Sequence, residues 1–231
     1  MHPDALASQP AALAQPRTIF QRRSGASLLW RVVTLAERCA CIVALLLLSP
    51  IWLTVAVAIT VLSGEGPLIA VLRSGRFGRP LWLLKFRTMW SGSRGTRWPI
   101  FHIEHIVDEQ GPAHKESSDH RVTSAWARFC RRFSIDEIPQ LLNVVGGEMS
   151  LVGPRPLTSS ELSRYYGKDA AEVLSVRPGI SGLWQVNGRN SLPYVERRRL
   201  DVLLIRTLSL KLYLRILLRT IPVVLTGRNS W

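Results

Sequence analysis

Apolar residues are concentrated in one long segment in the first third of the chain. Residues 39–62 contain no charged side chain, and their number satisfies the roughly 20 apolar residues that a helical membrane span requires. Ser49 and Pro50 lie near the middle of this segment. Proline removes a backbone donor and clashes with the preceding turn, and a serine hydroxyl can bond a carbonyl freed in this way. The pattern therefore predicts two helical halves with a break at Ser49 and Pro50.

A second apolar pattern lies near the end of the chain. Residues 200–225 are rich in leucine, isoleucine and valine, and Lys211, Arg215 and Arg219 recur every four residues. This spacing places the three cations on one face of a helix and apolar side chains on the other. Two interpretations stay open: a helix that lies in a membrane interface, and an ordinary amphipathic helix packed on a core. We expect Pro222 to bend or end the helix and Gly227 to close it.

The stretch between these two segments mixes strand and helix patterns. Residues 68–72 and 81–86 have the composition of short strands, joined by a basic turn at 73–80. Residues 91–115 predict a loop, whereas residues 122–133, 139–145 and 160–176 predict helices. The predicted fold class is therefore α+β and mostly helical.

The distribution of charge indicates how the first apolar segment meets a membrane. The chain has 30 lysines and arginines against 16 acidic residues, which gives a formal net charge of +14. Five of the cations precede residues 39–62 and the other 25 follow them. Because flanks rich in lysine and arginine stay in the cytoplasm, we predict a re-entrant segment with both ends on the same face. A tilted spanning helix with a proline kink is the alternative. We expect a flexible tail (residues 1–26), a membrane-embedded re-entrant helix (27–62) and a cytosolic domain that ends in an interfacial helix (63–231).

Two adjacent carboxylates, Asp136 and Glu137, are the first candidates for chemistry. A carboxylate pair can hold a divalent cation, and one carboxylate can act as a nucleophile. The same pair is also typical of a helix start, where carboxylates complement the helix dipole and Ser134 would be the cap.

Fixed cations near this pair favour the chemical interpretation. A stiff turn at residues 153–156, with one glycine and two prolines, presents Arg155. Carboxylates beside several cations provide the charge neutralisation and positioning that phosphoryl transfer requires. The candidate phosphate-binding cations are Lys85, Arg87, Arg131 and Arg155.

Residues 177–190 form a second unusual run, which combines glycines, amides, guanidinium groups and Trp184. Stacking and bidentate contacts from such a run could bind a nucleotide. The candidate substrate-binding residues are Arg177, Gln185, Asn187 and Arg189. A structural loop around a core tryptophan is an equally good interpretation of the composition.

Three longer motifs resemble the bacterial sugar transferases, the monotopic phosphoglycosyl transferases. They read KFRTM at 85–89, DEIPQLLNVVGGEMSLVGPRP at 136–156 and RPGISGLWQVNGRN at 177–190. With the apolar segment, its serine and proline, and the dipeptide at 200–201, the resemblance covers residues 36–227 in matching order, as in the short form of the family. One position departs from the family pattern, because Ser74 stands where glutamine is usual.

The resemblance implies a function, a mechanism and a location. Asp136 would attack the β-phosphate of a UDP-sugar, release UMP and carry the phosphosugar, which undecaprenyl phosphate would then accept. Glu137 would hold Mg²⁺, and Lys85, Arg131 and Arg155 would lie near the phosphates. The helix break at 49–50 would return the chain to the cytoplasmic face of the bacterial inner membrane, in contact with membrane lipids. The motif around Trp184 favours glucose or galactose as the sugar, in exopolysaccharide or other glycan synthesis.

Two interpretations without catalysis compete with this one. The first is a membrane-tethered basic module that binds nucleic acid or anionic lipid, and the second is a scaffold for polysaccharide assembly. The sequence contains no helix-turn-helix, zinc-finger or RNA-binding signature, so we expect no nucleic-acid partner. The presence of Asp136, Glu137 and Arg155 argues against a scaffold.

Overall fold

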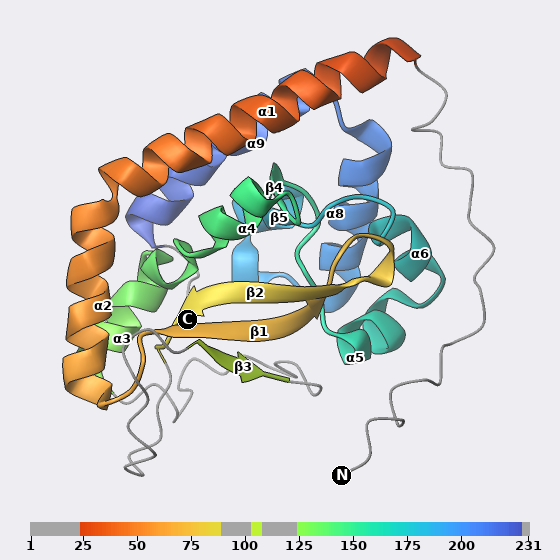
Figure 1. The fold of residues 1–231 in the computed structure, drawn as a ribbon. Coiled ribbons are helices and arrows are strands. Elements are labelled where there is room, and N and C mark those ends of the chain that lie inside the picture. Colours follow the sequence, from red (N-terminus) through yellow and green to blue (C-terminus); the bar gives the residue numbers. More distant parts are fainter. Residues whose placement is uncertain (1–23, 89–102, 108–123, 228–231) are drawn as a thin grey trace, which may run out of the picture.

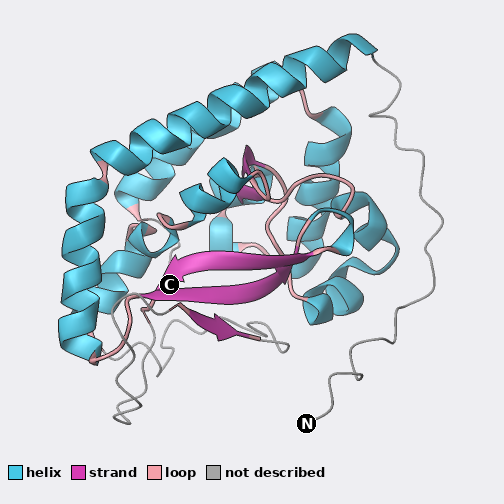
Figure 2. Cartoon of the chain, viewed as in Figure 1, coloured by secondary structure: helices cyan, strands magenta, loops and turns pink. Residues whose placement is uncertain are grey.

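A computed structural model describes residues 24–88, 103–107 and 124–227 of the chain. Long helices frame one side of the molecule, and a small sheet and several short helices fill the other side (Figure 1). Helices predominate over strands (Figure 2). The predicted α+β, mostly helical fold class is confirmed. Most of the predicted N-terminal tail lies outside the described residues.

The first apolar segment forms two helices, α1 (Ser24–Leu47) and α2 (Ser49–Ser63), which meet at an angle of 62°. Pro50 lies in the first turn of α2, where its missing N–H is tolerated. The Ser49 hydroxyl donates to the Leu46 carbonyl at 2.7 Å, so the predicted break and its serine bond are confirmed. Within the described residues no single helix meets the length and hydropathy of a membrane span, but this bent pair meets them together.

The sheet follows α2 directly. Strands β1 (Leu68–Ser74) and β2 (Pro80–Phe86) pair antiparallel around a 3₁₀ turn at Arg76–Gly78, as the sequence predicts. A third strand, β3 (Glu104–Ile106), pairs parallel to β1 and gives the order β2-β1-β3. The loop predicted for residues 91–115 is therefore wrong at β3. A strand of three residues is too short for a period-two pattern to reveal it.

Two helices joined by a tight turn follow the sheet in the described part of the chain. Helix α3 (Ala125–Arg132), the 3₁₀ turn η4 (Ile135–Glu137) and helix α4 (Gln140–Gly146) follow one another. The helices predicted at 122–133 and 139–145 are confirmed in the described part of the chain. Asn143 of α4 bonds the backbone of β2, accepting from Leu84 N at 3.1 Å and donating to Trp82 O at 2.9 Å. This bridge holds α4 against the open edge of the sheet.

Two short strands after α4, β4 (Ser150–Val152) and β5 (Gly179–Ser181), pair parallel to form a second sheet. The start of β5 and the residue after β4 approach so closely that a Cβ on Gly179 would lie 2.0 Å from Gly153 N. Gly179 N donates to Pro154 O at 2.8 Å and Gly153 N donates to Ser181 O at 2.9 Å. The turn at 153–156 is therefore held by the backbone of the second motif.

The predicted helix at 160–176 is wrong as a continuous element. The structure has α5 (Ser159–Glu161), a π-helical turn (Leu162–Tyr166), a 3₁₀ turn (Gly167–Asp169) and α6 (Ala170–Val173). Gly167 at φ +47° interrupts the helical path. The run at 177–190, expected as a loop, contains β5, helix α7 (Leu183–Asn187) and the start of a 3₁₀ turn (Arg189–Ser191).

The C-terminal apolar segment is two helices rather than one. Helices α8 (Tyr194–Thr207) and α9 (Leu210–Thr226) are separated at Leu208 and Ser209, and the Ser209 hydroxyl caps α9 by accepting from Leu212 N. A polar cap inside an apolar run restarts the helix. Pro222 lies inside α9 without ending it, and Gly227 closes the helix in the left-handed conformation.

Helix α9 lies alongside α1, beneath it in the view of Figure 1. Trp30 of α1 meets Tyr213 of α9 edge to face, with ring centroids 6.0 Å apart. The three cations of α9 are exposed, as are many large apolar side chains on the outer faces of α1, α2 and α9. These three helices thus present a broad apolar surface.

Candidate active site

The carboxylate pair lies in the tight turn between α3 and α4. Asp136 and Glu137 belong to the 3₁₀ turn η4, and Ser134 before it adopts the left-handed conformation at φ +56°. That conformation is costly for a non-glycine residue and is common at functional sites. The Ser134 side chain makes no cap hydrogen bond to the turn. The expectation that Ser134 caps the turn is therefore wrong, although both carboxylates do lie in its first turn.

Two predicted cations converge on one carboxylate oxygen. Lys85 Nζ, at the end of β2, lies 3.4 Å from Glu137 Oε1, and Arg155 Nη1, on the turn after β4, lies 3.9 Å from the same oxygen. All three side chains are partly buried. The structure thus brings the motif at 85–89 against the motif at 136–156, and within the latter it brings Arg155 back to Glu137.

A third cation joins the cluster from the run at 177–190. Arg189 Nη2 donates to Ser134 Oγ at 2.6 Å, and Arg189 itself adopts φ +52°. Burial lowers the pKa of Arg189, the Glu137 and Asp136 carboxylates raise it, and Arg155 lowers it. These mutual effects indicate that the two carboxylates and the two guanidinium groups share one partly buried site.

Cys130 lies in α3, and its thiol is buried near the Asp136 carboxylate. Burial, and then the neighbouring Asp136 carboxylate, raise its pKa to about 11. A thiol with so high a pKa stays protonated at neutral pH and is a poor nucleophile. Asp136 is therefore the better candidate for nucleophile in this part of the site.

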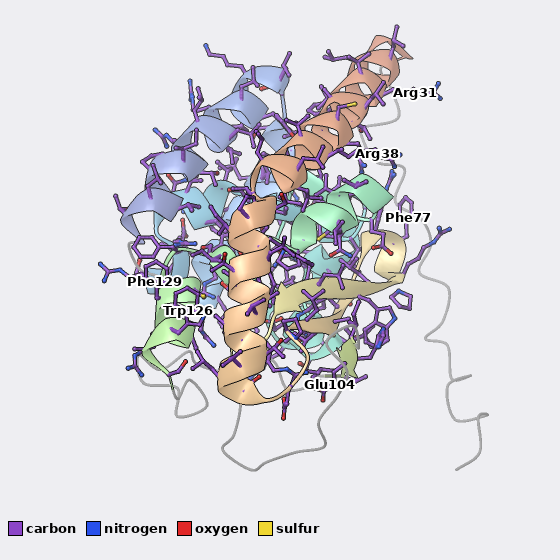
Figure 3. The ribbon with its side chains drawn as sticks, turned by 60° about the vertical axis from the view of Figure 1, so that its left-hand side comes forward. Arg31, Arg38, Phe77, Glu104, Trp126 and Phe129 are labelled. Carbon is purple, nitrogen blue, oxygen red and sulfur yellow. The ribbon has the colours of Figure 1, made fainter. Side chains whose placement is uncertain are left out.

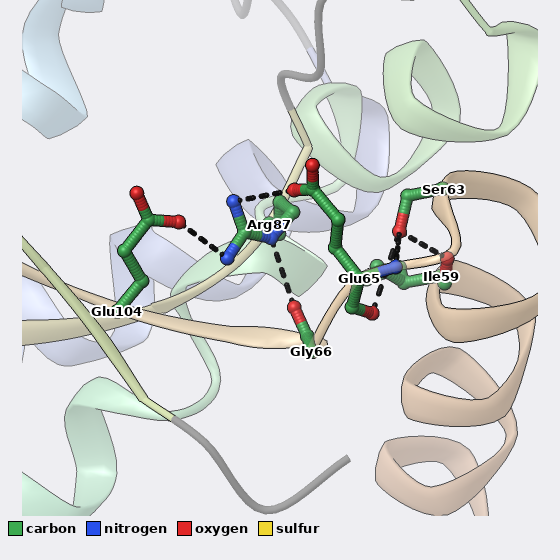
Figure 4. Close-up of polar contacts among 6 residues, drawn as sticks. All are labelled: Ile59, Ser63, Glu65, Gly66, Arg87 and Glu104. Carbon is green, nitrogen blue, oxygen red and sulfur yellow. Dashed lines mark hydrogen bonds and ion pairs between the residues drawn. The ribbon is translucent and has the colours of Figure 1, made fainter. Parts of the chain in front are cut away.

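Arg87 lies away from this cluster, although it follows Lys85 closely in the sequence. Its guanidinium is held by Glu65 at 2.9 Å and Glu104 at 2.7 Å, and its Nε donates to Gly66 O at 2.9 Å (Figure 4). These contacts tie the end of α2 to β3. The prediction that Arg87 binds phosphate finds no support in this geometry, because two carboxylates already neutralise the cation.

Arg177 is also placed elsewhere, against helix α1. Its Nη2 donates to Thr34 Oγ1 at 2.7 Å and lies 3.9 Å from Glu37 Oε2. Arg131 occupies the last turn of α3, where its carbonyl accepts from Ser134 N at 3.2 Å. Its side-chain role stays a prediction.

The two amides of the second motif differ in environment. Gln185 buries both polar side-chain atoms, and neither has a hydrogen-bond partner within the described residues. Asn187 is exposed, and its Oδ1 accepts from Arg219 Nη1 of α9 at 3.4 Å. Ser74, the departure from the family pattern, ends β1, where its backbone N–H donates to Leu157 O at 2.8 Å.

Trp184, which was singled out from the sequence, belongs to a buried layer next to Arg155 whose other members were not predicted as part of the site. Trp184 is flanked by Arg155 and Arg197, whose guanidinium carbons lie 5.9 and 4.9 Å from the ring centroid. Asp201 is fully buried, accepts from Tyr166 OH at 2.8 Å, and has a pKa raised to about 7 by burial. The signal in the sequence was an aspartate directly before the apolar run at 202–205, in the dipeptide 200–201.

An apolar groove of about 670 Å³ lies between α2 and α3. Its walls include Leu53, Val57 and Ala58 of α2 and Trp126 of α3. Trp126 and Phe129 stack with centroids 5.6 Å apart and lie next to α2 in the side view of Figure 3. Because α3 leads directly into η4, this groove and the carboxylates lie on adjacent elements.

The two carboxylates are the kind of oxygen ligand that a magnesium ion takes. Mg²⁺ prefers oxygen ligands and is commonly held by one or two carboxylates together with substrate phosphates and water. Asp136 and Glu137 supply adjacent oxygen donors. Within the described residues no group of three or more acidic, histidine or cysteine side chains is placed to hold a metal ion.

Comparison with known proteins decides the family. The sequence pattern described as bacterial sugar transferase matches residues 29–227. The chain belongs to the bacterial sugar transferase family. The resemblance drawn from the motifs is thus confirmed, and the match includes helices α8 and α9 as well as the carboxylate turn.

Named relatives within the family add detail. The exopolysaccharide production protein ExoY of Rhizobium meliloti is 40% identical over 192 residues, which cover 82% of this chain and 83% of the relative. The UDP-glucose:undecaprenyl-phosphate glucose-1-phosphate transferase of Caulobacter vibrioides is 37% identical over 239 residues, covering 98% and 83%. The undecaprenyl-phosphate galactose phosphotransferase of Salmonella typhimurium is 39% identical over 160 residues, covering 69% of this chain and 33% of that longer protein.

Proposed function

We propose that this protein transfers a hexose 1-phosphate from a UDP-sugar to undecaprenyl phosphate and releases UMP. The observation that carries the proposal is the carboxylate turn: Asp136 and Glu137 lie between cations from three separate elements, Lys85, Arg155 and Arg189. Phosphoryl transfer requires this combination of a nucleophile with fixed positive charge around it. Family membership and the names of the relatives support the same reaction.

In the first step, a carboxylate oxygen of Asp136 attacks the β-phosphorus of the UDP-sugar. The bond from this phosphorus to the bridging oxygen breaks, and the electron pair leaves with UMP. The product is an acyl phosphate between Asp136 and the sugar phosphate. Lys85 and Arg155 lie close enough to Glu137 to reach oxygens of a diphosphate bound over the turn, where they would offset the charge that develops on the leaving group.

In the second step, an oxygen of undecaprenyl phosphate attacks the same phosphorus. The bond to Asp136 breaks, the carboxylate is regenerated, and the product is a lipid diphosphate that carries the sugar. Splitting the reaction in this way avoids bringing three highly charged groups together at once. Arg189, which is partly buried and fixed by Ser134, is suited to orient the phosphosugar between the two steps.

Magnesium would be held by Glu137, with Asp136 beside it, and would supply charge neutralisation at the diphosphate. In the structure Glu137 pairs with two cations, Lys85 and Arg155, which hold its carboxylate in place. Lys85 and Arg155 would then turn toward substrate phosphate once the carboxylate binds metal.

The proposed location is the cytoplasmic face of the bacterial inner membrane. The bent pair α1–α2 would enter the bilayer and return, since cations flank it on both sides. Exposed apolar side chains on α2, such as Val57 and Val61, would contact lipid. Helix α9, with its exposed cations and apolar residues, would lie in the interface.

The sugar is glucose or galactose in this proposal. Relatives named for each of the two sugars match the chain at similar identity, 37% and 39%. The two hexoses differ in the orientation of one hydroxyl group, and discrimination rests on a few hydrogen bonds. Gln185, with two polar atoms that have no partner in the described part of the chain, is a residue suited to such recognition.

The test is UMP release by detergent-purified protein with a panel of UDP-sugars, undecaprenyl phosphate and Mg²⁺. Wild type is compared with Asp136→Asn and with a matched control, Asp169→Asn, at an aspartate that pairs with Arg198 outside the site. We expect sustained, lipid-dependent UMP release by wild type and the control, with loss in Asp136→Asn. If folded wild type releases no UMP from any UDP-sugar, the transferase proposal is wrong and the membrane-tethered basic module takes its place.

A further inference from the structure

A buried carboxylate outside the site joins the membrane-facing helix to the rest of the protein. Glu37 of α1 is 4% exposed and is the only acidic residue in α1 and α2. Its Oε1 accepts from Ser150 Oγ at 2.5 Å, from Leu151 N at 2.9 Å and from the Tyr213 hydroxyl. Its Oε2 lies 3.9 Å from Arg177 Nη2.

This one side chain therefore links α1 to two elements that are distant in sequence. Ser150 and Leu151 belong to β4, and Tyr213 belongs to α9. Arg177 adds a second link, because it also donates to Thr34, one turn before Glu37 in α1. The remaining contacts of this part of α1 are largely apolar, such as Trp30 and Val33 packed near Tyr213.

We propose that Glu37 is a positioning residue that fixes the register of α1, and with it the bent helix pair, against the part of the protein that carries the reacting groups. Apolar surfaces can slide or rotate past one another at small cost, because hydrophobic contact is not directional. A carboxylate with several hydrogen bonds is directional, and shifting it by one residue would leave its charge buried and unpaired. The network thus selects one register of the helix.

The contact with β4 relates this register to the site. Strand β4 runs into the turn at 153–156, which presents Arg155 to Glu137 at 3.9 Å. The membrane-facing surface of α1 and α2 and the carboxylate turn are thereby held at one relative height. This inference rests on the proposed function, since only a substrate drawn from the membrane depends on that height.

The two substrates should respond differently when Glu37 is lost. A UDP-sugar comes from the aqueous phase and meets groups on the turn η4, on β2 and on the 153–156 turn. A polyprenyl phosphate must come from the bilayer, so its access depends on how deep the helix pair places the site. Loss of register should therefore raise the KM for the lipid acceptor and leave the reaction with UDP-sugar nearly unchanged.

The experiment compares Glu37→Leu, an apolar replacement of similar volume, with Arg31→Leu. Arg31 is an exposed residue of α1, so its replacement also removes one charge from the helix. Each protein is reconstituted in lipid nanodiscs. We measure the UMP burst without acceptor, the KM and kcat with polyprenyl phosphate, and amide hydrogen exchange of the peptide that contains Leu151.

For Glu37→Leu we expect an unchanged burst and a rise of about tenfold or more in the KM for lipid, the size expected for loss of charge-assisted hydrogen bonds. The Leu151 peptide should exchange faster, because its amide loses its acceptor. Arg31→Leu should match wild type in all three measurements. A parallel fall of burst and lipid turnover, or an unchanged KM for lipid, would overturn the proposal.

The exchange measurement separates this inference from the proposed function. If wild type shows neither burst nor turnover, the proposed function fails, and with it the role assigned to Glu37 in acceptor use. Exchange at Leu151 still reports whether the carboxylate holds α1 to β4. Unchanged exchange in Glu37→Leu would refute the link itself, whatever the enzyme does.

Discussion

Replacing Asn143 by alanine tests the link between the sheet and the carboxylate turn. Asn143 is 4% exposed and makes three hydrogen bonds, to Leu84 N, to Trp82 O and to Glu148 Oε2 at 2.9 Å. Strand β2 is an edge strand of the described sheet, so the backbone groups that Asn143 bonds face α4 and not another strand. The variant leaves both backbone groups without this partner.

The expected loss of stability follows from the two backbone groups, Leu84 N–H and Trp82 C=O, that lose their partner. An unsatisfied buried backbone group costs about 1–3 kcal/mol, and Leu84 and Trp82 are half-buried, which favours the lower part of that range. We expect Asn143→Ala to lower the free energy of unfolding by about 2–4 kcal/mol. For a chain of this size the melting temperature should fall by roughly 5–15 °C. The Lys85–Glu137 contact should loosen as well, because β2 carries Lys85 and α4 follows Glu137.

The assay is thermal unfolding in detergent, followed by UMP release at a temperature where the variant remains folded. Glu148→Ala is the matched control, because it removes only the partner of Asn143 that is itself exposed. It should change the free energy of unfolding by less than about 0.5 kcal/mol. An Asn143→Ala protein that melts within a degree of wild type would refute the reasoning that this side chain holds the sheet.

Three further predictions concern charge, metal and topology. Because burial raises the pKa of Asp201 from its ordinary value of 3.8 to about 7, the folded state retains that proton longer than the unfolded state does. Its contribution to stability should therefore be largest below pH 4 and fall as the pH rises to 7, by up to about 1.4 kcal/mol per pH unit; unfolding titrations of Asp201→Asn should lack this slope. Chelation of divalent cations should abolish UMP release and added Mg²⁺ should restore it, with a higher Mg²⁺ requirement in Glu137→Gln; activity that survives chelation would contradict the metal role. For the topology, Ser27→Cys and Arg79→Cys are each made in a Cys39→Ala background. Both cysteines should react with an impermeant maleimide only after the inner membrane is opened. Labelling of either one in intact spheroplasts would contradict the re-entrant topology.

Local chemistry explains which parts of the fold were predictable. The break at Ser49 and Pro50 follows from the missing amide of proline and the hydroxyl beside it, both of which act within one helical turn. Strands β1 and β2 follow from short apolar runs on either side of a turn. The break between α8 and α9 was missed because leucine continues across it and only Ser209 marks the new helix start.

The site was predictable where its residues share a motif and unpredictable where they depend on distant partners. Lys85 and Arg155 were expected near the carboxylates, and both lie within 4 Å of Glu137. Arg87 was expected there too, but parallel pairing of β3 brings Glu104 to it, and no local pattern predicts that pairing. Glu37 shows the same limit, since its partner Tyr213 lies 176 residues away.

Detection of the phosphosugar on Asp136 tests the central claim most directly. Wild type is mixed with a UDP-sugar and Mg²⁺ in the absence of lipid acceptor, quenched in acid, and analysed by intact mass and peptide mapping. We predict one added hexose phosphate per chain, located on the peptide that contains Asp136, absent from Asp136→Asn and discharged by undecaprenyl phosphate. Lipid-dependent turnover with no adduct on wild type, or an unchanged adduct in Asp136→Asn, would contradict a covalent mechanism at this aspartate.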